Sequence, residues 1–332
     1  MLKKEIISAA IRHKDTKTVP YNIELCSKTM RSFAEKYNIQ SKDFADFSGN
    51  FIEKINYSGT KNLSDVLYQD DFNVVWKKSE GDDIGVVNEY LLREPDLKGF
   101  VFPEVKINEI YLKTENALSA GNQRFKVGKI GTLLFERAWS LRGMPELLMD
   151  FYDNPSFVHE LFEKITEYNI RVINAALAHD IDGFYFGDDY GQQTGLIMGK
   201  SLWRGFIMPY LKKTFGAVKK KNIPVILHSC GNIIEILPDL MDIGLDVYQT
   251  VQPEIYNLKE LKNKFGKNLT FYGGISTNFM AKASPEEVKE KINGTLKIFE
   301  GNGGFICAPA HQLPFDVPPE NVMAFIEIFK EK

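Results

Sequence analysis

The sequence predicts an α/β protein built as a (β/α)8 TIM barrel with N-terminal additions and an appended hairpin. Three observations predict this fold. From about residue 120, the 332-residue chain alternates short apolar runs with longer helical patterns. The runs are apolar throughout, which is typical of parallel strands buried on both faces. The length also suits one barrel of about 250 residues with additions.

The second part of the chain carries the clearest strand signals. Each run is short, bounded by Gly, Pro or Asp, and rich in Val, Ile, Phe or Tyr. The expected strands span residues 125–131, 183–189, 223–230, 246–252, 269–276 and 304–311. Helices between them have readable starts. Ser284 precedes a first-turn proline, with an acid three residues on, and Asn154-Pro155 opens a run with one apolar face.

The front of the chain is less regular. Residues 19–25 fit the first barrel strand, and residues 71–94 read as a hairpin near the barrel mouth, with its turn at Gly81-Asp82-Asp83. One barrel strand between residues 30 and 120 stays unplaced, and a doubly wound open sheet is the rival architecture. We expect one domain over residues 1–332, in which residues 1–120 hold the additions and residues 121–332 the core.

Composition excludes several classes of function. The chain has 41 Lys and Arg against 44 Asp and Glu, so it lacks the net positive charge that is typical of nucleic-acid-binding proteins. It has no apolar run of about 20 residues for a membrane span and no signal-peptide pattern, so we expect a cytoplasmic protein. Three cysteines, an odd number, favour a metal or a reactive thiol over disulfides.

Polar residues gather where the predicted strands end. In parallel barrels these ends form one rim, where active sites are assembled. Asp188 and Asp189 could be general acids, could orient a substrate hydroxyl or could cap a helix. We expect three further side chains from these strands to contact a substrate: Tyr185, Gln249 and His311.

Three residues suggest a metal site. His228 and Cys230 are two apart on a strand and therefore point to the same face. The strand that carries Cys307 closes the barrel and ends at the same mouth. Two thiolates and one imidazole form a zinc set with an open position, as in catalytic sites, and Glu254 is a candidate fourth ligand. The alternative is that each is an ordinary core side chain.

Several motifs occur in a fixed order: HSCGN, VQPE, FYGGIST, GGFICAPAH and DVPPEN. Together they resemble the uroporphyrinogen decarboxylase superfamily over roughly residues 120 to 330, which implies an α/β barrel. The decarboxylases carry paired arginines near the N-terminus, where this chain has only Arg31. The zinc-dependent, cobalamin-linked methyltransferases of the superfamily carry a His-x-Cys motif and a distant Cys, which resemble His228, Cys230 and Cys307.

The resemblance implies a methyl transfer that involves a corrinoid (cobalamin) on a separate protein docked over the barrel mouth. We expect O-demethylation, in which a methoxylated aromatic substrate gives its methyl group to Co(I), with Trp76 and Tyr90 walling in the ring. Two thiolates would neutralise Zn²⁺ and favour the other direction, from methylcorrinoid to a thiol. A zinc-free decarboxylase-like enzyme and a non-catalytic barrel that binds corrinoid protein are further alternatives. We expect no nucleic-acid or membrane partner.

Overall fold

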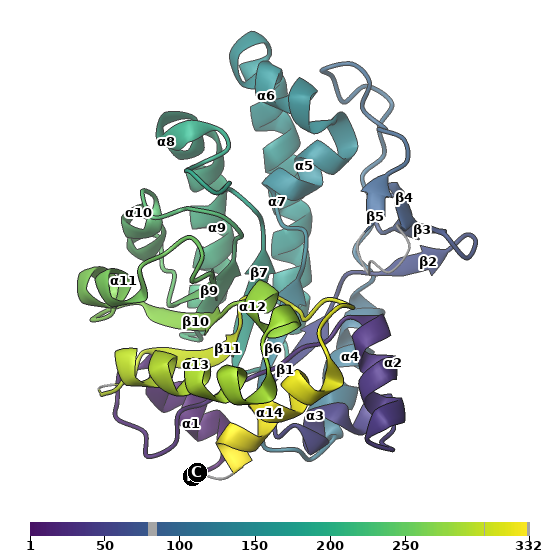
Figure 1. Cartoon of the computed structure of the whole chain (residues 1–332). Coiled ribbons are helices and arrows are strands. Elements are labelled where there is room, and N and C mark those ends of the chain that lie inside the picture. Colours follow the sequence, from purple (N-terminus) through teal and green to yellow (C-terminus); the bar gives the residue numbers. More distant parts are fainter. Residues whose placement is uncertain (79–84, 302, 331–332) are drawn as a thin grey trace.

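A computed structural model describes residues 1–78, 85–301 and 303–330 of the chain. Its core is a curled, parallel sheet in which each strand pairs with the next along the chain, in the order β1-β6-β7-β8-β9-β10-β11 (Figure 1). The α/β barrel prediction is confirmed. The strands are β1(Ile52–Asn56), β6(Phe125–Ile130), β7(Gly183–Gly187), β8(Val225–His228), β9(Val247–Val251), β10(Thr270–Ile275) and β11(Phe305–Pro309).

Residues 20–25 close the barrel between its two edge strands. Parallel bridges join Tyr21 to Cys307 and Leu25 to Leu313 on the β11 side. On the β1 side, the backbone N–H of Phe51 donates to the carbonyl of Tyr21 at 3.2 Å. The segment predicted as the first strand therefore fills the eighth place, and the strand that the sequence left unplaced is β1.

Helices cover the outside of the barrel (Figure 1). Helix α4 packs on β1, α7 on β6, α9 on β8 and α13 on β10. The helices of the outer layer and the loops are α2(Ser27–Lys36), α3(Phe44–Phe47), α4(Ile107–Ser119), α5(Phe135–Arg142), α6(Met144–Asp153), α7(Pro155–Ala176), α8(Gly199–Leu202), α9(Met208–Lys219), α10(Leu237–Asp242), α11(Leu258–Phe265), α12(Thr277–Lys282), α13(Pro285–Ile298) and α14(Pro319–Lys330). Between α8 and α9 lies a π-helical turn, Trp203–Ile207.

Helix α1(Lys3–Ile11) lies across the N-terminal ends of the strands. The N–H of Lys4 donates to Gln123, just before β6, and the N–H of Gly304, just before β11, donates to Ala10. The helix therefore covers the end of the barrel opposite the one at which the predicted site residues lie.

Two helix starts match the sequence reading. Helix α13 opens with a capping box in which Ser284 and Glu287 satisfy each other's backbone N–H groups. Helix α7 begins at Pro155 and buries the apolar face that includes Phe157, Leu161 and Ile165.

A small antiparallel sheet stands beside the barrel mouth (Figure 1). It consists of β2(Thr60–Asn62), β3(Leu67–Asp70), β4(Val75–Lys78) and β5(Gly85–Val87). Strands β4 and β5 pair as the predicted hairpin, whose turn at residues 81–83 lies outside the described residues. The appended hairpin is confirmed as part of a larger sheet.

Asp70 ties this small sheet to the barrel. Its carboxylate accepts hydrogen bonds from Phe72 N, Val74 N and Trp76 Nε1. It also forms a buried ion pair, 2.5 Å long, with Arg137 of α5. The sheet is thereby held against α5 with Trp76 turned to the cavity described below.

Within the part of the chain that the structure describes, no helix combines the length and the apolar character needed to cross a bilayer.

Candidate functional site

Tyr185 and Gln249 fix the orientation of His228, the last residue of β8. His228 pairs in register with Gln249 of β9, and its Nδ1 contacts Gln249 Oε1. The same oxygen accepts a hydrogen bond from Tyr185 Oη at 2.7 Å. An amide oxygen only accepts, so this arrangement places the imidazole proton on Nδ1 and leaves the Nε2 lone pair free for a ligand. Burial lowers the pKa of His228 to about 4, which keeps the ring neutral at neutral pH.

His228, Cys230 and His311 bring their donor atoms together. One nitrogen from each imidazole and the sulfur all lie within 4.8 Å of one another, a spacing that can hold a metal ion. His228 Nε2 is 3.4 Å from Cys230 Sγ, and the two imidazole rings are 5.4 Å apart. Burial raises the pKa of the Cys230 thiol, and Asp189 raises it further. A thiolate here therefore needs a cation beside it, as a metal ligand would have.

The structure differs from the sequence expectation at the third donor. Cys307 is buried within β11 and is not a member of the donor group. Phe305, two residues earlier, stacks on Phe299 at the end of α13, with ring centroids 4.0 Å apart. Alternation along a strand gives Cys307 the same face as Phe305, toward the helices. His311, which lies beyond the end of β11 and was predicted to contact substrate, takes the third place.

The structure explains why the HSCGN motif has a glycine at position 231. Its φ is +79°, and a Cβ there would clash with the backbone of Gly191. Its N–H donates to Gln252 Oε1 at 2.9 Å, and the N–H of Cys230 donates to Asp189 Oδ1 at 2.8 Å. These contacts set the position of the Cys230 sulfur.

Gly231→Ala is expected to displace Cys230 and to lower metal affinity by about 10- to 100-fold, the usual cost of disturbing the surroundings of a ligand. Titration of the metal-loaded protein with a chelator measures this. Gly195→Ala is the matched control, because a Cβ at Gly195 meets no atom within 4 Å. Equal affinity in both variants would contradict the positioning role of Gly231.

The two predicted acids have different surroundings. Asp188 is fully buried and accepts hydrogen bonds from Leu134 N, Phe135 N and Glu136 N at 2.7–3.1 Å, at the start of α5. Tyr190 Oη adds a fourth at 2.7 Å. Because α5 has no capping side chain of its own, Asp188 serves as its cap. Of the three roles expected for these acids, Asp188 therefore has that of a helix cap.

Asp189 faces the cavity instead. Its side chain is 36% exposed, and its Oδ1 lies 3.7 Å from His228 Nε2. It is therefore the acid of the predicted pair that a bound molecule can reach.

Glu136, in the first turn of α5, is a site residue that the sequence reading missed. It lines the same cavity as Asp189 and His228. Burial raises its pKa well above the usual value, and the charges of Asp189 and Asp188 raise it further. Both effects shift the carboxyl group toward its protonated form. Its position just after the predicted strand at 125–131 could have identified it, because the other predicted site residues also lie at or just after the ends of predicted strands.

Glu254, the candidate fourth ligand, lies elsewhere. It is exposed in the loop after β9, where Ser276 Oγ donates to its carboxylate. It belongs neither to the donor group nor to the residues that line the cavity. Ser276 also caps α12, so this contact links two loops of the rim.

The cavity above the donor group measures about 370 Å³. Among its many polar lining residues are four aromatic side chains: Tyr68, Trp76, Trp139 and Tyr185. Trp76 and Trp139 meet edge to face with ring centroids 6.1 Å apart. Such a wall suits a flat, apolar ring. Tyr90, which the sequence reading also proposed as a wall residue, is 39% exposed and does not line this cavity.

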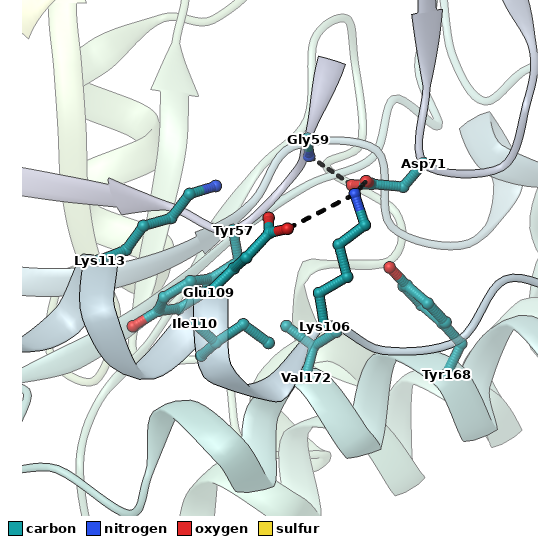
Figure 2. Close-up of a pocket in the computed structure, with 9 residues that line it drawn as sticks. All are labelled: Tyr57, Gly59, Asp71, Lys106, Glu109, Ile110, Lys113, Tyr168 and Val172. Carbon is teal, nitrogen blue, oxygen red and sulfur yellow. Dashed lines mark hydrogen bonds and ion pairs between the residues drawn. The ribbon is translucent and has the colours of Figure 1, made fainter. Parts of the chain in front are cut away.

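A much smaller hollow of about 10 Å³ lies between the loop after β1 and α4 (Figure 2). Lys106 Nζ is 3.8 Å from both Asp71 and Glu109, and Gly59 N donates to Asp71. The hollow has room for about one water molecule. Lys106 already pairs with Asp71 and Glu109, so we assign the hollow to anchoring the small sheet.

Comparison with known proteins gives two kinds of similarity. Residues 135–332 match the family described as Uroporphyrinogen decarboxylase (URO-D). The uroporphyrinogen decarboxylase of Ruthia magnifica subsp. Calyptogena magnifica is 23% identical over 186 residues, which are 54% of this chain and 51% of that protein. That of Vibrio campbellii is 26% identical over 189 residues, 54% and 50% of the two chains. The matches thus span about half the length of these curated relatives.

Solved structures share the fold over more of the chain. A methyltransferase from Methanosarcina mazei has a TM-score of 0.77 and 18% identity, covering 100% of this chain and 99% of that one. A B12-independent methionine synthase from Shewanella sp. W3-18-1, in complex with selenomethionine, has a TM-score of 0.52 and 10% identity, covering 95% and 97%. At these identities the likeness concerns the fold.

Proposed function

This chain belongs to the uroporphyrinogen decarboxylase family, and we propose that it acts there as a zinc-dependent methyltransferase. The observation that carries the proposal is the convergence of His228, Cys230 and His311 below an aromatic-walled cavity. Two imidazoles and one sulfur are donors that zinc prefers, and a three-ligand set leaves a position open for a substrate.

The cavity argues against a porphyrinogen substrate. Its lining includes five acids, Glu24, Asp70, Asp71, Glu136 and Asp189, but only three strong bases, Lys54, Lys129 and Arg137. Arg137 is already paired with Asp70. A tetrapyrrole with many carboxylates would need an excess of positive charge.

The donor set bears on the direction of transfer. One thiolate and two neutral imidazoles leave a zinc ion with net positive charge, whereas the two-thiolate set expected from the sequence would cancel it. A zinc ion held here would supply Lewis acidity toward an ether oxygen. With His311 in place of Cys307 as the third ligand, the site therefore favours cleavage of a methoxy group over activation of a thiol as a thiolate.

The residues that line the cavity would then have different roles in the reaction. The aromatic wall holds the ring of a methoxylated substrate, and Gln249 keeps His228 oriented. A Co(I) corrinoid protein docked over the mouth would accept the methyl group as the second substrate, and the electrons of the broken C–O bond would stay on the oxygen. Glu136 supplies the proton that makes the leaving group a neutral phenol, and Asp189 orients it.

Anaerobic incubation of the zinc-loaded protein with a Co(I) corrinoid protein tests this function. The panel contains methoxyaromatics, methylamines and thiols, and methyl-Co(III) is followed by its absorbance while phenol release is quantified. We expect methyl transfer from a methoxyaromatic with one phenol per methylated cobalt. Methylation of a thiol by methyl-Co(III), without demethylation of any methoxyaromatic, would contradict the proposed direction.

A further inference from the structure

Two lysines point into the cavity from neighbouring strands. Lys54 of β1 and Lys129 of β6 both line it. Asn56, two residues after Lys54, pairs in register with Lys129, so the two lysines share the inner face of the barrel. Lysine is rare inside proteins unless its charge has a partner.

Glu24 is near both ammonium groups but forms an ion pair with only one of them. Lys54 Nζ lies 2.6 Å from Glu24 Oε1, which also accepts a hydrogen bond from Asn22 Nδ2 at 3.2 Å. Within the described residues, Lys129 Nζ has neither a hydrogen bond nor an ion pair. Burial alone would raise the pKa of Glu24, but Lys54 and Lys129 outweigh it and lower that pKa. Glu24 therefore favours its ionised form, and with both lysines charged this end of the cavity carries one positive charge in excess. Burial and the charge of Lys54 lower the pKa of Lys129, so a further anion beside it would stabilise its charged form.

Tyr185 connects this charge with the donor group. Lys54 Nζ lies 4.2 Å from the centre of the Tyr185 ring, and Lys129 Nζ lies 5.9 Å from it. The Tyr185 ring is also 6.4 Å from the ring of His228. The lysines and His228 thus lie close to the same tyrosine in one cavity, so a substituted aromatic ring bound there can contact both.

We propose that Lys129 and Lys54 form a subsite for a carboxylate on the substrate ring, so that the substrates are methoxylated aromatic acids. This rests on the proposed function for the methoxy group, but the carboxylate subsite stands on the lysines alone. An unpaired, partly buried ammonium is costly in the free protein and gains most from an anionic ligand. The excess of a single charge also matches one carboxylate.

Equilibrium binding tests the subsite without turnover. Quenching of tryptophan fluorescence, with Trp76 and Trp139 in the wall, gives Kd values for 4-methoxybenzoate and for the neutral 4-methoxybenzamide. We expect the zinc-loaded wild type to prefer the acid by about 10-fold or more, the value of a hydrogen bond to a charged group. Lys129→Met is expected to abolish that preference and to change the Kd of the amide by less than about 2-fold.

Two further variants complete the test. Lys129→Arg restores a cation and should restore the preference, and Lys77→Met removes an exposed lysine of β4 and should leave it intact. Binding of the amide by Lys129→Met reports that the variant is folded. An equal loss for both ligands, or no preference in the wild type, would overturn the subsite. Lysine-dependent binding of 3-mercaptopropionate but not of the aromatic acid would overturn the substrate class. A lysine-dependent preference without demethylation would support the subsite and refute the proposed function.

Discussion

His311→Ala is expected to lose stoichiometric zinc, whereas Cys307→Ala is expected to keep it. The reason is geometric, since the donor atom of His311 belongs to the group within 4.8 Å and the sulfur of Cys307 does not. Activity of His311→Ala should fall by at least about 100-fold, the cost of removing one group that stabilises a transition state. Metal analysis of the purified proteins measures the first effect and the corrinoid assay the second.

Matched variants make this result decisive. Cys230→Ala should behave like His311→Ala, because both remove a donor. Cys307→Ala shortens a buried side chain and should cost only about 1 kcal/mol of stability, as small core truncations do. Loss of zinc from Cys307→Ala, together with its retention in His311→Ala, would restore the ligand set expected from the sequence.

Asp188→Ala is expected to lower the free energy of unfolding by about 3 kcal/mol or more, because several buried N–H groups at the start of α5 would lose their acceptor. The loss should also move Glu136, whose own N–H donates to Asp188. Denaturation in urea measures the change in stability.

The neighbouring acid provides the contrast. Asp189→Asn keeps an oxygen that can accept from Cys230 N and lies at a partly exposed position, so its stability should change by less than about 1 kcal/mol. Its demethylation rate should still fall, because the charge beside the cavity is gone. If Asp188→Ala were as stable as Asp189→Asn, the capping role of Asp188 would be refuted.

Local sequence signals identified most of the barrel. Strands β6 to β11 were visible as short apolar runs with turn residues at both ends, and residues 19–25 were predicted as the first barrel strand. Strand β1 was missed, because IEKIN carries two charged residues that the fold turns to opposite sides. Lys54 points into a polar cavity, whereas an apolar run would be expected of a strand buried on both faces.

The charged interior of the site was also hidden in the sequence. Glu24, Lys54, Lys129 and Glu136 come from four different elements or segments and belong to no motif. Only the closure of the sheet into a barrel brings them to one cavity. A pattern in one sequence shows which residues are neighbours along the chain, whereas these four residues meet only because separate elements pack together.

The sequence by itself determined that an imidazole and a sulfur, His228 and Cys230, stand together at the end of one strand, because residues two apart on a strand share a face. Which side chain of β11 and its following loop joins them was decided only by the tertiary structure. Cys307 lies within β11, so its direction follows from which face of that strand meets the helices, whereas His311 lies beyond the end of the strand, where the alternation no longer applies. Packing of Phe305 against Phe299 turns Cys307 toward the helices, and the backbone after β11 brings His311 to the third place.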